Sequence, residues 1–329
     1  MKITIAGAGA IGCFTGALLS SRHSVTLLGR PYVLDPVRQN GLHVTDFGGL
    51  DEHVPADQIA TSTCADSLAG ADLVIVTVKS GGTASIAEDI AGHVSPDTPV
   101  LSWQNGLKPV QDLRSKLPRH DVRAGMVPFN VVPKGAGHYH RATSGEIVIE
   151  NGSGELPGAL DVPHLPVLGS DRIAAVQWGK LVVNLNNALN ALSGMTLKRQ
   201  LLDRNWRRVM ANQMAEALRI LKTAGIEVAS TTPLPAWANP YMLRLPTPLF
   251  SRIAARMITI DPEARTSMAY DLEAGRKTEV ADLQGEILTL AQRHSCQAPI
   301  CSQVMQAVRD AEGKGPGCPG LKPEIFDAS

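Results

Sequence analysis

The chain has 329 residues, of which 44% are hydrophobic and 19% are charged, and its 31 basic side chains balance 31 acidic ones. This composition is typical of a globular protein, and the length favours two domains over one core. The even charge argues against nucleic acid or an anionic membrane as partner. No apolar stretch is long enough to span a membrane, and glycines interrupt the apolar N-terminus, so we expect a cytoplasmic protein without a signal peptide.

The five cysteines are odd in number and scattered along the chain. Their positions match neither a disulfide framework nor a zinc-ligand spacing. We therefore expect reduced thiols and no metal.

A glycine-rich turn lies between an expected strand at residues 2–6 and an expected helix at residues 11–21. Gly7 allows the tight turn, Gly9 leaves room for a pyrophosphate, and Gly12 lets the helix pack closely on the strand. The following helix directs N–H groups at the phosphates. The alternative is a glycine turn without a ligand. The residues that we expect to bind a dinucleotide here are Gly7, Ala8, Gly9, Ala10, Ile11 and Gly12.

Arg30 follows the second expected strand, residues 25–29. An NAD site usually has an acidic residue there, which accepts a hydrogen bond from the ribose 2′-hydroxyl. A guanidinium instead pairs with a 2′-phosphate, so the sequence favours NADP(H). The alternative is an ordinary surface arginine.

Alternating strand and helix signals predict a Rossmann-type α/β domain over residues 1–170, with a parallel-dominated, doubly wound sheet. We expect residues 127–145 to be irregular and residues 151–169 to be a Gly/Pro-rich connection. Residues 171–329 predict an all-α second domain. The expected strands are 2–6, 25–29, 42–45, 73–78, 99–102, 122–127 and 146–150, and the expected helices of the first domain are 11–21, 83–91 and 110–117.

In the second domain, helices are expected at 173–192, at 205–224 and within 263–293. Five prolines between residues 233 and 248 indicate a connection that is not regular helix. We expect the Gly/Pro-rich tail after residue 313 to be loosely ordered.

The helix expected at 173–192 carries a polar face formed by Gln177, Lys180, Asn184 and Asn187. A lysine flanked by asparagines could hold an anionic, oxygen-rich substrate and donate a proton to a nascent alkoxide. A solvated helix face explains the same pattern equally well.

Four further polar residues attract attention for their positions. Lys79 and Asn105 follow expected strands, where ligands of doubly wound sheets bind, although Asn105-Gly106 could be only a turn. Ser267 and Glu279 belong to a polar cluster near a helical core stripe, for which a solvated face is the stronger explanation on pattern alone.

Taken together, five motifs in this order resemble the ketopantoate reductase family over most of the chain. The resemblance implies NADPH-dependent reduction of the 2-keto group of ketopantoate (2-dehydropantoate) to pantoate, a step of pantothenate biosynthesis. The matching motifs are residues 7–12, 76–80 with Lys79, 104–106, 177–181 with Asn184, and 266–268 through 276–279.

The resemblance also implies roles for single residues. Lys180 is expected to be the general acid, and Glu279 to bind the hydroxyl end of the substrate in the catalytic centre, next to the cofactor. Ser267 and Asn184 are expected to contact the substrate's carboxylate or hydroxyl. Asn105 is expected to lie between nicotinamide and substrate. Arg30 and Lys79 are expected on the phosphate side of the cofactor.

One position departs from the family pattern: residue 188 is alanine where a second asparagine is expected, and Asn187 is a candidate substitute. This departure keeps one alternative open, an NADP-dependent reductase or dehydrogenase of another small 2-keto or hydroxy acid. A second alternative, of a different class, is a non-catalytic NADP(H) sensor, against which the presence of Lys180 and Glu279 argues. The expected partner is a small keto acid, and the sequence leaves a homodimer open.

Overall fold

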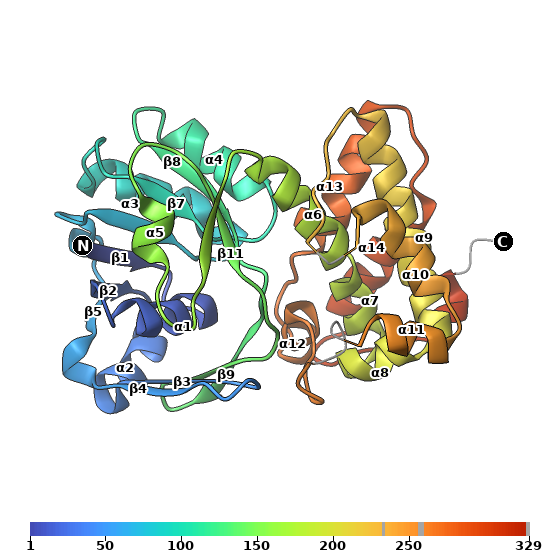
Figure 1. Ribbon diagram of the computed structural model, residues 1–329, viewed down its shortest axis with the longest axis horizontal. Coiled ribbons are helices and arrows are strands. Elements are labelled where there is room, and N and C mark those ends of the chain that lie inside the picture. The colour runs from blue at the N-terminus through green and yellow to red at the C-terminus, as the bar shows by residue number, and fades with distance from the viewer. Residues whose placement is uncertain (232–233, 256–259, 327–329) are drawn as a thin grey trace. The chain divides into compact units, whose positions relative to one another are not determined.

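The computed structural model describes residues 1–231, 234–255 and 260–326, and the chain divides into two compact units, Met1–Ala174 and Ala175–Ser329. The first unit is blue to green in Figure 1 and the second yellow-green to red. In the described part of the chain, no helix is both long and apolar enough to cross a membrane.

The first unit is built on an eight-stranded sheet with the order β12-β11-β8-β7-β6-β1-β2-β5. Strands β8, β7, β6, β1, β2 and β5 run parallel to one another, and β11 is antiparallel to β8. The expectation of a parallel-dominated sheet is therefore confirmed. The strands are β1 (Lys2–Ala6), β2 (Ser24–Leu28), β5 (Ala60–Ser62), β6 (Leu73–Val76), β7 (Val100–Ser102), β8 (Val122–Met126), β11 (Ile147–Glu150) and β12 (Val167–Ser170).

The central strands are apolar on both faces because helices cover both faces of a doubly wound sheet. Every residue of β6, which reads Leu-Val-Ile-Val, is buried. The order also contains a switch point, since the chain leaves β1 for β2 on one side and returns to β6 on the other. The helices of this unit are α1 (Ala10–Leu19), α2 (Pro31–Asn40), α3 (Thr83–His93), α4 (Lys108–Lys116) and α5 (Leu156–Leu160).

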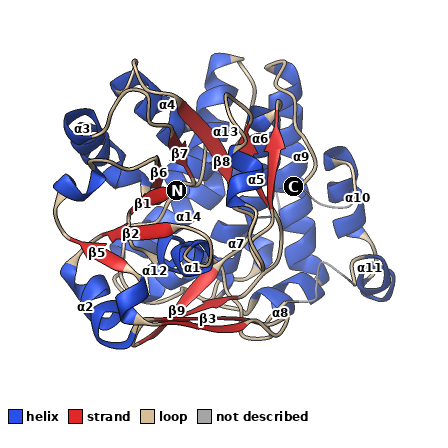
Figure 2. Ribbon diagram, turned by 60° about the vertical axis from the view of Figure 1, so that its left-hand side comes forward, coloured by secondary structure: helices blue, strands red, loops and turns tan. Residues whose placement is uncertain are grey.

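A second, four-stranded sheet has the order β4-β3-β10-β9. Helix α1 contacts both β1 and β2 of the large sheet and β3, β9 and β10 of the small one. Figures 1 and 2 accordingly show α1 between the two sheets. The strands are β3 (Leu42–Asp46), β4 (Asp51–Val54), β9 (Val131–Gly135) and β10 (His138–Arg141).

The small sheet corrects the expectation that residues 127–145 are irregular. Gly135, Ala136 and Gly137 all have positive φ and form the turn of a hairpin between β9 and β10. Pro133 is tolerated because β9 is an edge strand, where a missing N–H costs no ladder bond. The strand expected at 42–45 is real, but it belongs to this sheet.

The stretch 151–169 is also more than a connection. It contains α5, and it continues into β12, which pairs in parallel with β11. The glycines and prolines of this stretch are typical of a loop. Strand β12 is defined by its pairing with β11, which the residue types of the stretch do not indicate.

The second unit is helical, as expected. Helix α9 is central to it and contacts α8, α10, α13 and α14. The helices are α6 (Ile173–Asn184), α7 (Asn186–Ser193), α8 (Leu197–Leu202), α9 (Arg204–Thr223), α10 (Asn239–Arg244), α11 (Thr247–Ile253), α12 (Ser267–Glu273), α13 (Val280–Arg293) and α14 (Pro299–Gly313).

Two expectations for this unit were wrong. The proline-rich connection contains α10 and α11, in which Pro240 and Pro248 occupy the first turn, where a missing N–H is harmless; Pro233 lies outside the described residues. The tail is held in place as far as residue 326, because Leu321 N donates to Leu192 O at 2.8 Å and Phe326 is buried beside Trp206.

Candidate functional site: two sets of polar residues

The glycine turn after β1 leaves no space for side chains at two of its glycines. Gly7 has φ +117°, and a Cβ there would lie 2.5 Å from the backbone nitrogen of Val78. A Cβ at Gly12 would lie 2.4 Å from the carbonyl oxygen of Gly7. At Gly9 the nearest atom to such a Cβ is 4.0 Å away. Gly7 and Gly12 are thus required by the fold, whereas Gly9 keeps a surface clear above the turn.

The end of β2 packs against the same glycine turn. The Leu28 carbonyl accepts hydrogen bonds from Gly7 N and Ala8 N, both at 2.9 Å. A Cβ at Gly29 would lie 2.5 Å from the Cβ of Ala8, so Gly29 is needed for this close approach. Sequence reasoning did not single out Gly29, although a glycine directly before Arg30 was visible.

Arg30 is exposed and is the N-cap residue of α2. Its side chain makes no hydrogen bond or ion pair with another side chain in residues 1–231, 234–255 and 260–326. The guanidinium is therefore available to an anion beside the glycine turn. Helix N-termini also favour negative charge, so the position suits a phosphate.

Lys79 and Asn105 follow β6 and β7, and a buried glutamine ties these two strand ends together. Gln104 Nε2 donates to the Val78 carbonyl at 3.0 Å and to Thr83 Oγ1 at 2.8 Å, and its Oε1 accepts from Ser102. Lys79 and Asn105 are exposed at the surface of this pair of loops. Gln104 was part of a motif, but its positioning role becomes visible only in three dimensions.

The strand order brings the four loops together. The glycine turn follows β1, Arg30 follows β2, Lys79 follows β6 and Asn105 follows β7, and these are four neighbouring parallel strands, β7-β6-β1-β2. Parallel strands end at the same edge of a sheet, next to the switch point, where open α/β sheets bind their ligands. This edge offers glycine backbone, helix N–H groups and two cations to a dinucleotide.

The second set of residues begins on α6 with Gly179 and Lys180. A Cβ at Gly179 would lie 1.9 Å from the carbonyl oxygen of Ala229, and Ala229 N donates to the Ala175 carbonyl at 3.0 Å. The chain after α9 therefore crosses α6 in direct contact, directly before Lys180. Only glycine permits this crossing.

Within this second set of residues, Lys180 has a lowered pKa. Its side chain is only partly accessible, and burial lowers the pKa of its ammonium from 10.5 to about 8. Desolvation disfavours the charged form, because a buried ammonium loses hydration. A lysine with this pKa is mostly protonated at pH 7 and gives up its proton more readily than an ordinary lysine.

The helix that carries Lys180 is interrupted once, at Leu185, between α6 and α7. The Leu185 carbonyl accepts a hydrogen bond at 2.9 Å from Gln284, which is fully buried on α13. Asn184, buried, ends α6, and Asn187, half-buried, lies in the first turn of α7. Gln284 thus fixes the junction around which both asparagines lie. Ala188 is buried in the core of the unit.

A buried amide group then anchors the start of α12. Asn190 Oδ1 accepts from Thr266 N at 3.0 Å, and Thr266 Oγ1 donates to the Asn187 carbonyl at 3.1 Å. Asn190 Nδ2 also donates to Gln200 Oε1 at 3.1 Å. Because Ser267 is the next residue, these bonds hold the serine beside α7. Neither Asn190 nor Gln200 was singled out from the sequence.

Glu279 is the N-cap residue of α13, five residues before Gln284. The bond from Gln284 to the α6–α7 junction therefore links the helix that begins at Glu279 to the helix that carries Lys180. An ammonium, a carboxylate, a hydroxyl and two amides on linked helices form a donor and acceptor set suited to a small hydroxy or keto acid.

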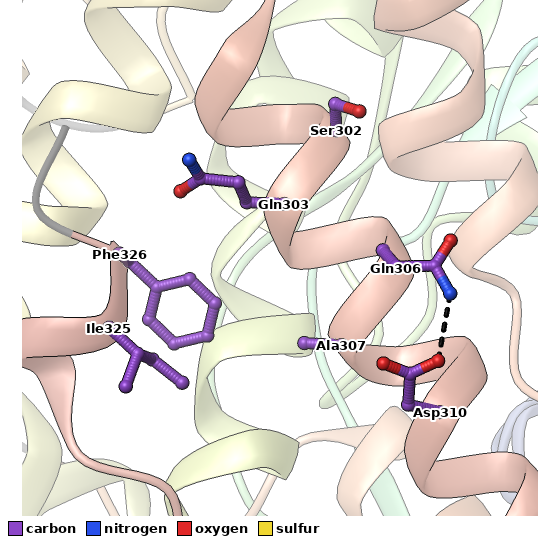
Figure 3. A pocket seen from close by; sticks show the side chains of 7 residues that line it. All are labelled: Ser302, Gln303, Gln306, Ala307, Asp310, Ile325 and Phe326. Atoms are coloured by element: carbon purple, nitrogen blue, oxygen red, sulfur yellow. Dashed lines mark hydrogen bonds between the residues drawn. The ribbon is translucent and has the colours of Figure 1, made fainter.

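A pocket of about 440 Å³ lies elsewhere in the second unit, between α14 and the C-terminal segment (Figure 3). Ile325 and Phe326 face it from one side, and Gln306, which donates to Asp310 at 2.7 Å, lies on the other. None of the site residues expected from the sequence lines it.

Comparisons with known proteins agree with the two-part organisation. The family model described as "Ketopantoate reductase PanE/ApbA" matches residues 3–154, and the model of its C-terminal domain matches residues 172–312. A 2-dehydropantoate 2-reductase from Halobacterium salinarum is 27% identical, over 96% of this chain and 100% of that protein.

Two solved structures are similar over nearly the whole chain. A PanE/ApbA family ketopantoate reductase from Ralstonia eutropha JMP134 is 30% identical, with a TM-score of 0.80 over 95% of this chain and 99% of that one. D-mandelate dehydrogenase, crystallised with NADH and anilino(oxo)acetate, is 22% identical, with a TM-score of 0.76 over 95% and 99%. The second likeness shows a shared fold alone.

Proposed function

Because the chain belongs to the ketopantoate reductase family, a family of oxidoreductases that act on CH–OH groups, we propose that it reduces 2-dehydropantoate to pantoate with NADPH. The observation that carries the proposal is Lys180, an ammonium with a pKa of about 8 on a helix shared with Asn184. A sensor needs no proton donor of this kind, so the enzyme is the better explanation.

The first unit is proposed to hold the cofactor. The glycine turn fits a pyrophosphate, because Gly9 leaves its surface clear while Gly7 and Gly12 admit no side chain. Ala8, Ala10 and Ile11 contribute backbone to this cradle, and Lys79 and Asn105 lie at the ends of the neighbouring strands. When bound, the cofactor supplies a hydride.

Arg30 is proposed to select NADPH over NADH by pairing with the 2′-phosphate. Replacing it by glutamine removes the charge and keeps a polar side chain. We expect Arg30→Gln to raise the KM for NADPH at least about tenfold, the scale of a charge-assisted hydrogen bond, and to leave the KM for NADH unchanged. An equal change for both cofactors would contradict this role.

The second unit is proposed to hold the substrate and the acid. Lys180 donates a proton to the substrate's carbonyl oxygen as negative charge develops there. Ser267 and the amides of Asn184 and Asn187 bind the carboxylate, and Glu279 accepts a hydrogen bond from the substrate hydroxyl. Asn187 is assigned here because Ala188 is buried and carries no polar group.

The role of Lys180 is tested by turnover of NADPH with 2-dehydropantoate, followed by absorbance. We expect Lys180→Ala to lower kcat by on the order of a hundredfold or more, the usual scale for a positioned acid. The reduction rate of the unaltered enzyme should fall as the pH rises above about 8, because Lys180 then loses its proton. Near-normal turnover by Lys180→Ala would refute the assignment. The matched control is Lys222→Ala, which removes an exposed lysine of α9.

A second candidate function is reduction of another small 2-keto acid, or oxidation of the matching hydroxy acid, on the same scaffold. The alanine at position 188 favours it, as does the shared fold of D-mandelate dehydrogenase, which was crystallised with NADH. A panel of 2-keto acids, each assayed with NADPH and with NADH, distinguishes the two. Turnover of another acid without turnover of 2-dehydropantoate would establish the alternative.

A homodimer is also proposed. Trp237 and Tyr241 are about two-thirds exposed and contact each other edge to face, with ring centroids 6.4 Å apart. Large exposed aromatic side chains of this kind are enriched at protein interfaces. Light scattering after size-exclusion chromatography should give twice the mass of one chain; the mass of a single chain would contradict the dimer.

A further inference from the structure

Three histidines lie side by side across the small sheet of the first unit. His43 on β3 is directly opposite His53 on β4 in the antiparallel pair, and directly opposite His138 on β10 in the parallel pair. Directly opposed residues on neighbouring strands project from the same face of a sheet. The three imidazoles therefore form a row on the face opposite to the one that carries buried Val44 and Tyr139.

The row is in contact along its whole length. The His43 ring is stacked between the other two, with centroid distances of 4.0 Å to His53 and 4.2 Å to His138 and interplanar angles of 11° and 20°. His43 Nε2 is 2.8 Å from Asp51 Oδ1. His138 Nε2 is engaged 2.8 Å from Thr45 Oγ1. The His43 ring is thus held on both faces and at its edge, with Nε2 directed at a carboxylate.

Two imidazoles of this row lie next to one carboxylate, that of Asp51. One ligand atom each from His43, Asp51 and His53 lies within 4.8 Å of the other two. We propose that His43, Asp51 and His53 bind a divalent transition-metal ion of the zinc class, with water as the fourth ligand. Two histidines and a carboxylate suit zinc, nickel or copper, whereas magnesium and calcium prefer oxygen ligands.

The three ligand atoms lie near enough for one tetrahedral ion, but the stacked His43 and His53 rings have to turn before both nitrogens face it. Zinc lies about 2.0–2.2 Å from nitrogen and oxygen ligands, which places neighbouring ligand atoms about 3.3–3.5 Å apart. The 2.8 Å distance between His43 Nε2 and Asp51 Oδ1 has to widen by about 0.6 Å to admit the ion. His53 and Asp51 are both exposed, so their side chains can make the remaining adjustment, including rotation of the His53 ring out of the stack.

The ion would add metal–ligand bonds between β3 and β4, which here are joined by backbone pairing, the His43–Asp51 hydrogen bond and the His43–His53 stack. His53 and Asp51 belong to β4, which is an edge strand of the small sheet, and His43 belongs to β3. A ligand that binds only the folded state stabilises it by mass action. The site is therefore proposed to stabilise the sheet and to leave the chemistry of Lys180 unchanged.

Zinc binding to the full chain, produced without a polyhistidine tag, tests the proposal. Titration calorimetry should give one saturable Zn²⁺ equivalent per chain, and Co²⁺ should give the visible absorption of a tetrahedral complex. His53→Asn and Asp51→Asn each remove one ligand at an exposed position, and each should weaken binding at least about tenfold. Thermal unfolding without metal should be the same for both variants and the unaltered chain, which excludes misfolding as the cause.

The chain offers a matched control in His93, whose Nε2 is 3.1 Å from Asp66 Oδ1. Among the described residues, no group of three possible ligands includes this pair. His93→Asn should therefore leave zinc affinity unchanged. The proposal is overturned if no saturable equivalent binds, if His53→Asn and Asp51→Asn both bind as well as the unaltered chain, or if His93→Asn weakens binding equally.

Discussion

Replacing Lys180 by methionine should make the protein more stable and less active at the same time. Methionine keeps an unbranched side chain of similar length and removes the charge. The ammonium is costly in the folded state, because burial lowers its pKa from 10.5 to about 8. This difference corresponds to about 3 kcal/mol, since each pKa unit is worth about 1.4 kcal/mol. The free energy of unfolding should therefore rise by up to about 3 kcal/mol at pH 7.

The sign of the pH dependence follows from the direction of the shift. Below pH 8 the lysine is protonated in both the folded and the unfolded state, so the folded state bears the whole cost. Between pH 8 and 10.5 the unfolded state binds more protons, and the stability contributed by this group rises with pH. The advantage of Lys180→Met should consequently shrink across this range and disappear above it.

Urea unfolding at pH 7 and at pH 10, followed by circular dichroism, measures both quantities. Lys222→Met is the control, because it removes an exposed lysine from α9 of the same unit, and it should change stability little at either pH. The reasoning is refuted if Lys180→Met is no more stable than the unaltered chain at pH 7. It is also refuted if the gain is the same at both pH values. The role proposed for Lys180 also predicts that the same variant loses its reductase activity.

Three further predictions concern the scaffold. Gly12→Ala should lower the free energy of unfolding by about 2 kcal/mol, because its Cβ would meet the Gly7 carbonyl at 2.4 Å. Gly9→Ala should leave the free energy of unfolding unchanged and weaken NADPH binding. Denaturant unfolding measures the stability of both variants, and fluorescence titration measures their NADPH binding. Arg207→Met should cost about 4 kcal/mol in urea unfolding, because the fully buried guanidinium donates to four backbone carbonyls that would lose their partner. Glu216→Gln should lower stability by about 1–2 kcal/mol, since its carboxylate accepts from the N–H groups of Ile300 and Cys301 at the start of α14; an unchanged urea midpoint would contradict this.

The elements that were predicted well are those with a strong local pattern. Strand β6 is a continuous apolar run, and α9 has one apolar face over 20 residues, so both were expected within a few residues of their bounds. The missed strands β9 and β10 are short, contain a proline and charged or polar side chains, and form only by pairing with each other and with β3. These strands depend on pairing with a segment far away in the sequence, and a local sequence pattern does not indicate such pairing.

Some residues of the candidate site could likewise be recognised from the sequence, whereas others could be recognised only from the structure. Lys180 and Asn184 were visible as a polar face, but two explanations fitted that face equally well. The structure shows that burial lowers the pKa of Lys180. It also shows that the preceding residue, Gly179, has no room for a side chain. Asn190 and Gln284, which fix the helices around the candidate residues, looked like ordinary polar residues of helices. Their burial and partners depend on elements about 75 to 100 residues away.

The sequence by itself determined the class of fold and the chemistry on offer, because glycine spacing, an arginine after a strand and a lysine among asparagines are local facts of residue type. Only the tertiary structure decided how those groups are placed. Strand order collects four loops at one sheet edge, close packing desolvates one ammonium, and the pairing of β3 with β4 and β10 lines up three histidines. The physical reason is that burial and proximity, which set pKa values and ligand geometry, arise from contacts between distant segments.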